Sequence, residues 1–389
     1  MLLLRKMNSV QIQLEVISYM AFNNMDDVLG KYKVKLTENS SRKTKRIMKG
    51  GFRSYTIQTD ESFPLLAWHP SGKIIAVIRE RKGKIWLGFY TLDTKKYEES
   101  QLFNVEKILD FSYSDDGQLL VMSAVQKGQS DIFVFNVRSR TYEQITNDLY
   151  DDLNPRFFRN ATMIAFSSNR DNDSLNAKVV PVSAEGSYDI FIYDYQKKSS
   201  MLKRVTATKD INEMNPVQYD SLTIAYLTDK NGISNRSLAR LDSVISYIDT
   251  VEHYRYIIQT KQHTDYYRSV LWQDVNYSMN KLSEIVFENG RYRMYANDIK
   301  PWDEVSLTNP PANTAFREGV FKTDTVAKKG EPVVPVEKKS EEVKNETHET
   351  APADSGKINF PFSYFKPSNK SLLMSSGPSR SSQSANEPS

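Results

Sequence analysis

Hydrophobic and polar positions recur along this chain with a period close to 45 residues. Residues 66–77 and 111–122 each contain a short apolar segment with an aromatic residue, a polar turn with a glycine, and a second apolar run. A third copy begins at residue 155, and a looser copy spans 216–226. The first three copies begin at residues 66, 111 and 155, so their spacings are 45 and 44 residues. A repeat of about 40–45 residues is typical of one blade of a β-propeller.

Each repeat predicts four strands. Gly72 and Gly117 fit tight turns after the first strand, because glycine adopts the positive φ angles that such turns need. The apolar run that follows, such as Ile74–Ile78, is typical of a strand that is covered on both faces. The third strand alternates, as in Lys84–Tyr90, and the outermost one is more polar, as in Tyr142–Thr146. Polar outer strands keep a sheet edge from pairing with other chains.

The pattern therefore predicts an all-β fold, a β-propeller of five to six four-stranded blades. A fifth unit is expected at residues 276–307, and residues 31–59 could supply most of a sixth through Tyr32–Leu36 and Tyr55–Thr59. A β-sandwich also contains many short strands, but it does not repeat the same turn chemistry at a fixed interval.

The two ends of the chain depart from the repeat. Residues 1–49 are expected to form an N-terminal extension, either the remnant of an upstream domain or a partial blade. Alternation over residues 10–16 predicts a strand there, and residues 19–32 are expected to form a helix. The propeller is assigned to residues 50–322. Residues 323–389 are rich in Lys, Glu, Ser and Pro and poor in core-forming residues, a composition that predicts a disordered tail.

Composition and charge exclude several classes of protein. The absence of cysteine excludes disulfide scaffolds and thiolate metal sites. Basic and acidic residues number 52 and 48 and are interleaved, which does not favour binding to nucleic acid. The segment Met1–Lys6 has too few apolar residues before its first charge for a signal peptide. No stretch approaches the roughly 18 apolar residues of a membrane-spanning helix.

A cluster of basic residues lies in the N-terminal extension. Arg42, Lys43, Lys45 and Arg46 fall within a polar stretch of residues 37–50. Two interpretations remain open. The stretch could bind anionic lipid or phosphate, or it could be a solvated linker or outer strand, which is the usual role of such a charge run.

No motif for catalysis is found. The chain contains neither the Gly-x-Ser-x-Gly sequence that carries the nucleophile of α/β-hydrolases nor the His-Glu-x-x-His sequence of zinc proteases. His253 and His263 are ten residues apart, which is not a metal-ligand spacing, although Asp249 and Glu252 are nearby. We therefore predict a protein that is not an enzyme and that has no metal or cofactor.

One set of acidic residues recurs with the repeat. Glu61, Glu106, Asp152 and Glu213 each precede an inner strand by a few residues. In a propeller the loops that lead into the inner strands gather around one mouth of the central channel. Acidic side chains in these loops would focus negative potential there, which favours a basic partner segment. Acidic residues are also common in turns for local reasons, so the register alone does not establish this site.

The repeats resemble those of TolB-type propellers. The resemblance is carried by Trp68–Val77, Tyr113–Met122, and Phe166–Arg170 followed by Asp189–Asp194. The shared pattern is an aromatic residue, a turn ending in glycine, an apolar run, a Ser-x-Arg-like turn and Asp-Ile-aromatic. More closely, the chain resembles a large TolB-like protein of Bacteroidetes bacteria. This resemblance implies a periplasmic or outer-membrane-associated protein, and we expect the chain to be a fragment of a longer one.

These observations lead to one functional expectation and two alternatives. The chain is expected to be a non-catalytic scaffold at the bacterial cell envelope that binds a protein or peptide at the channel mouth. Other envelope or outer-membrane proteins are the expected partners, without nucleic acid or membrane insertion. The main alternative is a substrate-recognition or gating propeller of a peptidase or other hydrolase whose catalytic domain is absent from this chain. A third option is glycan binding through Trp86, Trp272 or Trp302.

Overall fold

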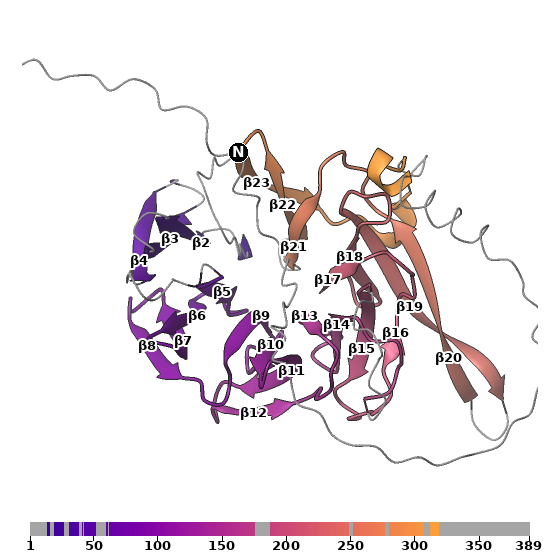
Figure 1. Ribbon diagram of the computed structural model, residues 1–389, viewed down its shortest axis with the longest axis horizontal. Coiled ribbons are helices and arrows are strands. Elements are labelled where there is room, and N and C mark those ends of the chain that lie inside the picture. The colour runs from indigo at the N-terminus through magenta and orange to yellow at the C-terminus, as the bar shows by residue number, and fades with distance from the viewer. Residues whose placement is uncertain are drawn as a thin grey trace, which may run out of the picture. The chain divides into compact units, whose positions relative to one another are not determined.

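The chain folds into a β-propeller, with blades arranged around a central axis (Figure 1). This computed structural model describes the following residues: 14–15, 19–26, 31–38, 41, 43–51, 60, 62–175, 187–248, 252–276, 280–306 and 312–318. Five sheets have four antiparallel strands and a sixth has three, which confirms the predicted fold class.

Each sheet is built from consecutive strands, numbered outward from the axis. The first blade contains β1 (Leu14–Glu15), β2 (Tyr19–Asp26), β3 (Lys31–Glu38) and β4 (Thr44–Gly51). The second contains β5 (Leu65–Trp68), β6 (Ile74–Arg81), β7 (Lys84–Thr91) and β8 (Tyr97–Gln101). The third contains β9 (Lys107–Tyr113), β10 (Leu119–Gln126), β11 (Gln129–Asn136) and β12 (Thr141–Gln144).

The remaining three sheets follow in the same order. The fourth contains β13 (Asp152–Phe158), β14 (Met163–Ser168), β15 (Asp189–Asp194) and β16 (Lys203–Arg204). The fifth contains β17 (Glu213–Gln218), β18 (Thr223–Thr228), β19 (Asn235–Ile248) and β20 (Glu252–Gln262). The sixth contains β21 (Val270–Asn276), β22 (Lys281–Glu288) and β23 (Arg291–Asp298). Two short helical segments follow, at Trp302–Glu304 and residues 315–318.

The core lies between the blades, because each inner blade is covered on both faces. In β10, Leu120 and Met122 pack with residues of the second blade, whereas Val121 packs with residues of the fourth. Both faces of this strand are therefore apolar, as the continuous run in the sequence predicted. Burial of a side chain of this size stabilises the fold by about 1.5–3 kcal/mol. The packing between blades thus requires the apolar run that recurs in every repeat.

A glycine turn holds the second and third blades close together. Gly117 has a φ of +73°, in the region that glycine adopts without strain. A Cβ atom at this position would lie only 2.1 Å from Nε2 of His69, which is in the corresponding turn of the second blade. The predicted glycine turn is confirmed, and a second reason for glycine there is the close approach of the neighbouring blade.

The helix expected over residues 19–32 is not formed, and that prediction is wrong. Residues 19–26 and 31–38 form β2 and β3, which pair from Tyr19 with Glu38 to Asp26 with Lys31. The reason is the period-two burial of Tyr32, Val34 and Leu36, which pack against the second blade. The described part of the N-terminal extension is therefore a blade. Residues 55–59 and the predicted disordered tail, 323–389, lie outside the described residues.

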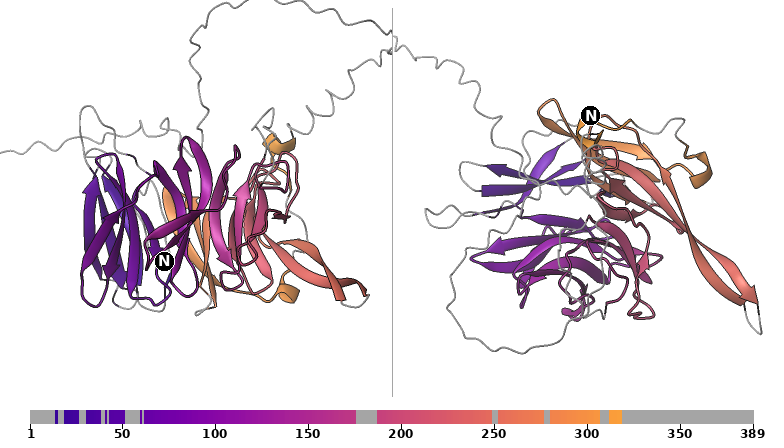
Figure 2. Two further views of the ribbon diagram at one scale, coloured as in Figure 1. Left: turned by 90° about the horizontal axis from the view of Figure 1, so that it is seen from below. Right: turned by 45° about the vertical axis from the view of Figure 1, so that its right-hand side comes forward.

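The two outer strands of the fifth blade, β19 and β20, are longer than those of the other blades. Strands β19 and β20 remain paired as far as Ile248 and Glu252. Figures 1 and 2 show this hairpin projecting beyond the rest of the fifth blade. In the described part of the chain, no helix has the length and hydropathy needed to cross a membrane.

A buried ionic network joins the fifth and sixth blades. Arg236 on β19 is 1% exposed, and its Nη2 donates to Glu284 Oε2 on β22 at 2.6 Å. Its Nε donates to Gln273 Oε1 on β21 at 2.7 Å, and the hydroxyl of Tyr266 donates to Glu284 Oε1 at 2.8 Å. The guanidinium is thus satisfied by the sixth blade, so the position of that blade depends on this contact.

Replacing Arg236 tests the dependence. Arg236→Ala should lower the free energy of unfolding by about 3–5 kcal/mol, because Glu284 would be left buried without its counter-ion. Urea denaturation near neutral pH measures the change. The double variant Arg236→Met, Glu284→Leu should recover part of the loss, because it removes both charges. A single variant within about 1 kcal/mol of the wild type would contradict this account.

Candidate functional site

One face of the propeller collects the loops that lead into the inner strands. These loops are 102–106, 145–151, 205–212 and 263–269, which precede β9, β13, β17 and β21. The turns between the second and third strands of the blades lie at the same end, as shown by the bond from the Lys127 backbone N–H to Glu106 Oε1 at 2.9 Å. We call this end the mouth face.

Glu106 is exposed on the mouth face. With Asn104, Val105, Gln126 and Lys127 it lines an open pocket of about 350 Å³. Glu61 lies outside the described residues.

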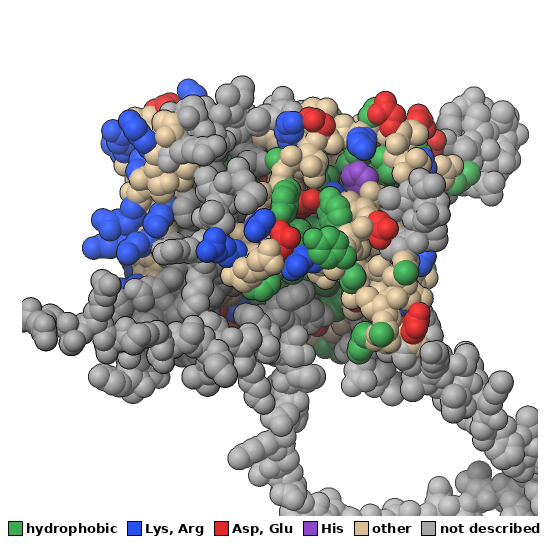
Figure 3. Space-filling model, turned by 90° about the horizontal axis from the view of Figure 1, so that it is seen from above, with side chains coloured by type: hydrophobic (Ala, Val, Ile, Leu, Met, Phe, Trp, Pro, Cys, Tyr) green, Lys and Arg blue, Asp and Glu red, His purple; other side chains and the backbone are tan. Residues whose placement is uncertain are grey.

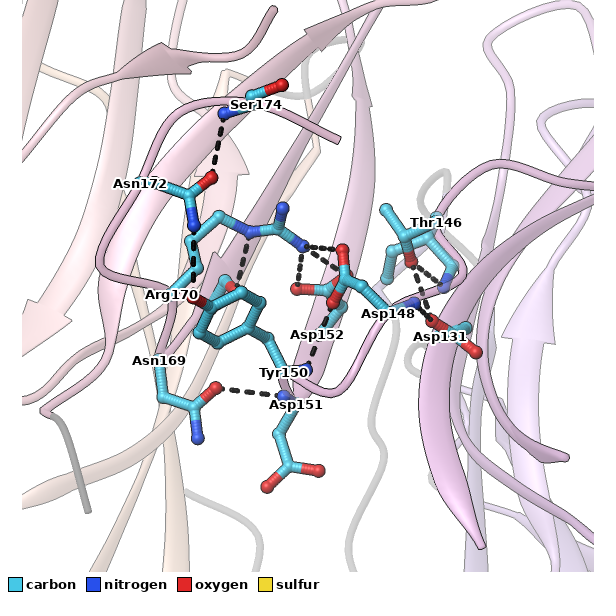
Figure 4. Close-up of polar contacts among 12 residues, drawn as sticks. Asp131, Thr146, Asp148, Tyr150, Asp151, Asp152, Asn169, Arg170, Asn172 and Ser174 are labelled. Atoms are coloured by element: carbon cyan, nitrogen blue, oxygen red, sulfur yellow. Dashed lines mark hydrogen bonds and ion pairs between the residues drawn. The ribbon is translucent and has the colours of Figure 1, made fainter. Parts of the chain in front are cut away.

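Asp152 is on the same face but is fully buried. Nη2 of Arg170 donates to both of its carboxylate oxygens, at 2.9 and 2.8 Å, and to Asp148 Oδ2 at 3.1 Å (Figure 4). Arg170 is two residues after the end of β14 at Ser168, and its side chain is completely covered. The carboxylate of Asp152 therefore lies below the surface of the mouth face, where a docked partner does not contact it.

Glu213 is also buried, at 4% exposure. Burial raises its pKa to about 7, and the nearby carboxylate of Asp189 adds to the rise. Its Oε2 has no hydrogen-bond partner within the described part of the structure. Loops that carry Glu106, Asp152 and Glu213 thus share one face, but only Glu106 presents its carboxylate to solvent. Partner binding by the four acids stays a prediction.

A repeated hydrogen-bonded unit shapes three of these loops. In the third blade Asp131 Oδ1 accepts from the Thr146 hydroxyl at 3.3 Å and from the Asp148 backbone N–H at 3.4 Å. Thr146 Oγ1 in turn accepts from the Ile132 backbone N–H at 2.9 Å. We call this unit the Asp–Thr clasp.

The clasp recurs in the next two blades. Asp189 accepts from Thr206 and from the Thr208 backbone at 3.3 and 3.1 Å. Asn235 accepts from Thr264 and from the Tyr266 backbone at 2.9 and 2.8 Å. Because an asparagine does the work of an aspartate in the fifth blade, the geometry of the clasp does not need a negative charge.

Excess negative charge surrounds the clasp of the third blade. Oxygen atoms of Asp131, Asp148 and Asp152 all lie within 4.8 Å of one another, a spacing that could hold a cation. Arg170 supplies a positive charge in contact with Asp148 and Asp152. Burial, together with the charges of Asp152 and Asp148, raises the pKa of Asp131 to about 7. Burial also raises the pKa of Asp152 to about 6, although Arg170 opposes it.

The channel below the mouth is also ionic. Arg156 on β13 donates to Asp110 Oδ2 on β9 at 2.7 Å. Burial raises the pKa of Asp274 on β21 to about 7, while the charge of Arg156 opposes the rise. Since these inner strands belong to three different blades, the side chains meet across the axis of the ring.

Large apolar side chains are exposed around the mouth, a feature that the sequence reasoning missed. Phe103, Leu149 and Tyr267 lie in three of the four loops and are 64%, 50% and 76% exposed. Phe316 is 75% exposed and follows Thr314, whose backbone N–H donates to the Asn231 carbonyl in a turn of the same face. A signal was present in the sequence, since Leu149 and Tyr267 each stand three residues after a clasp threonine.

The other residues considered for binding lie elsewhere. His253 and His263 are at opposite ends of β20, about 33 Å apart at 3.3 Å per residue, too far to share a metal. Burial lowers the pKa of His263 to about 4. Trp302 is buried, and Trp86 is half-buried with Arg81 4.0 Å above its ring, so neither presents an open stacking face for a sugar. Trp272 is half-buried.

Comparisons with known proteins support the fold. No protein-family model and no curated protein matches the chain in sequence. A putative TolB from Agrobacterium tumefaciens is similar in structure, with a TM-score of 0.50 and 15% identity over 70% of this chain and 86% of that one. TolB from Acinetobacter baumannii gives 0.45 and 16% over 71% of this chain, which spans 63% of the length of that protein. An acylaminoacyl peptidase gives 0.42 and 10% over 74% and 44%. The chain thus has a TolB-like propeller fold.

The raised pKa of Asp131 predicts an unusual pH dependence of stability. Between about pH 4 and pH 7 the folded state binds this proton and the unfolded state has lost it, so stability falls as pH rises through that window. Asp131→Asn removes the titration and keeps the clasp, as Asn235 does. The variant should be more stable than the wild type at about pH 8 by roughly 1 kcal/mol or more, with a smaller difference at about pH 5. Urea unfolding at the two pH values measures it.

Asp152→Asn is the matched control, because it also removes one carboxylate from the cluster. Burial raises the pKa of Asp152 only to about 6, because Arg170 opposes the rise, so Asp152→Asn should gain less stability at about pH 8 than Asp131→Asn. A larger gain for Asp152→Asn would contradict this ranking of the two carboxylates.

Proposed function

We propose that the chain is a non-catalytic scaffold of the bacterial cell envelope and that a protein or peptide partner docks on the mouth face. The observation that carries the proposal is the exposure of Phe103, Leu149, Tyr267 and Phe316 on a single face. Large apolar side chains exposed together on one face are typical of an interaction site. Aromatic side chains in particular are enriched among the residues that dominate binding energy.

Charge on the same face gives the partner its chemistry. Glu106, Asp151 and Asp171 are exposed there, next to the buried carboxylates of Asp152 and Glu213. A partner segment with basic residues flanking one or two apolar anchors would fit this combination. Surface charges of this kind mainly raise the association rate, and salt weakens their effect.

The envelope location and the absence of catalysis are parts of the proposal. They rest on the TolB-like repeats in the sequence and on the lack of a catalytic motif in it. In the alternative, a gating propeller of a peptidase or hydrolase, the same face would contact a catalytic domain. The apolar residues of the mouth serve either role, so the identity of the bound partner separates the two.

A double substitution tests the mouth face. Phe103→Ser with Tyr267→Ser should weaken binding of the partner at least about tenfold, because truncating an anchor residue costs roughly 1–2 kcal/mol or more. The measurement is recovery of cross-linked partners from envelope extract, followed by titration of the partner that mass spectrometry identifies. The purified chain should not hydrolyse peptide or ester substrates.

Met201→Ser with Tyr295→Ser is the control, because these two residues are exposed apolar side chains outside the mouth loops. Both variants should unfold near the wild-type urea concentration, since Phe103, Met201 and Tyr267 are more than half exposed and Tyr295 is 36% exposed. If the mouth variant and the control retain the same partner equally, the mouth face is not the docking surface. Recovery of a peptidase domain as the bound partner would favour the alternative.

A further inference from the structure

Five basic side chains lie on one face of the first blade. Lys31, Lys33 and Lys35 alternate along β3 with the buried residues Tyr32, Val34 and Leu36, so they all point to the opposite face. In the register with β4, Lys33 stands opposite Lys49 and Lys35 opposite Arg46. We call the set of Lys31, Lys33, Lys35, Arg46 and Lys49 the basic face.

The basic face is open to solvent. Four of its five residues are exposed and Lys35 is half-buried. Figure 3 shows Lys and Arg side chains gathered on the left of the view, the side on which β4 lies in Figure 1. Cations two residues apart on a strand are about 6.6 Å apart, and neighbouring strands are about 4.8 Å apart. The result is a closely spaced array of positive charge on one side of the sheet.

These five cations differ from several basic residues of the other blades. Those residues are paired with a carboxylate, as in Arg79 with Glu99 at 2.7 Å and Arg293 with Glu288 at 3.2 Å. Lys281 is likewise paired with Asp298. In the described residues no ion pair involves any member of the basic face. Among the described side chains this charge is not paired, and neighbouring cations on the two strands repel one another.

Protection of a sheet edge explains only part of this arrangement. Charged residues on an outermost strand prevent edge-to-edge pairing, and Arg46 and Lys49 on β4 serve that purpose. Lys31, Lys33 and Lys35 are on β3, which is already paired with β2 and β4. Three of the five cations thus need another explanation.

We propose that the basic face binds the surface of a membrane that contains anionic phospholipids. A plane of phosphate groups attracts an array of cations without a matching groove, and each Lys or Arg near such a surface adds to the attraction. Double-stranded DNA, in contrast, is read by an element that enters a groove, and single strands bind through stacking aromatic side chains. The described side chains of the basic face provide neither. The basic face is on the side of the first blade, whereas the mouth loops described above lead into the third to sixth blades, so a docked scaffold would keep these loops free.

Vesicle flotation tests the proposal with the full chain. Wild-type protein should float with vesicles of phosphatidylcholine that contain about one third phosphatidylglycerol, and not with phosphatidylcholine alone. Raising the salt concentration should reduce binding, because exposed charges are screened. The variant Lys31→Gln, Lys33→Gln, Lys35→Gln, Arg46→Gln, Lys49→Gln should partition at least about tenfold less, with an unchanged circular dichroism spectrum.

The control removes the same charge from other sites. Lys84, Lys96, Arg138, Lys209 and Lys230 are exposed, and changing all five to Gln again removes four lysines and one arginine. This control should retain most of the wild-type binding. Equal loss in both variants would show attraction by net charge alone and overturn the proposal.

Two further outcomes would also overturn it. One is binding to duplex DNA that is tighter than binding to the vesicles and is lost in the basic-face variant. The other is competition by inorganic phosphate at constant ionic strength, which would indicate a site for a small anion. Binding that survives both comparisons and needs the five residues supports the membrane surface.

Discussion

The Asp–Thr clasp is the constraint on which the mouth face depends. In each clasp, a carboxylate or amide near the start of the blade's third strand accepts two hydrogen bonds from the segment that follows the fourth strand. The donors are the threonine hydroxyl and one backbone N–H. Each such bond contributes only about 0.5–1.5 kcal/mol. Its larger effect is positional, since the loop leaves the clasp in a set direction and Leu149 and Tyr267 follow at the same offset. The positions of the exposed Leu149 and Tyr267 side chains are thus set by the buried residues of the clasp.

The second blade shows what happens without the clasp. The backbone bond from Leu102 to Ile85 corresponds to those from Ile145 to Ile132 and from Val205 to Ile190. By this register Lys84 and Phe103 occupy the positions of the aspartate and the threonine. The loop is held instead through its backbone, since the Tyr142 hydroxyl donates to the Phe103 carbonyl at 2.6 Å, and the Phe103 side chain is exposed in place of a buried hydroxyl. A phenylalanine at the position of the clasp threonine therefore replaces a buried hydrogen bond with an exposed side chain on the candidate binding surface.

Sequence reasoning reached the fold because blade packing leaves a strong periodic signal. Apolar runs such as Ile74–Ile78 and glycines such as Gly117 are local requirements, so they are visible without knowledge of neighbours. The helix predicted for residues 19–32 was wrong, because the pairing of β2 with β3 decides between helix and strand there. The local pattern of these residues does not show that pairing. The same limit applies to the acids. The sequence places Asp152 before an inner strand, but it does not show that the side chain is buried. Arg170 covers Asp152 because the end of β14 pairs with the start of β13.

The ring has a seam, because no blade mixes strands from both ends of the described chain. The first and last blades meet through contacts such as that of β1 with β21, and no sheet hydrogen bonds cross between them. Packing contacts of this kind separate without unravelling a strand, whereas tearing any blade would break a whole ladder of bonds. Under a pulling force or on warming, the circle should open at this junction first and leave each blade whole. The molecule would then behave as a chain of sheets that can uncurl, with its two end blades as the moving parts.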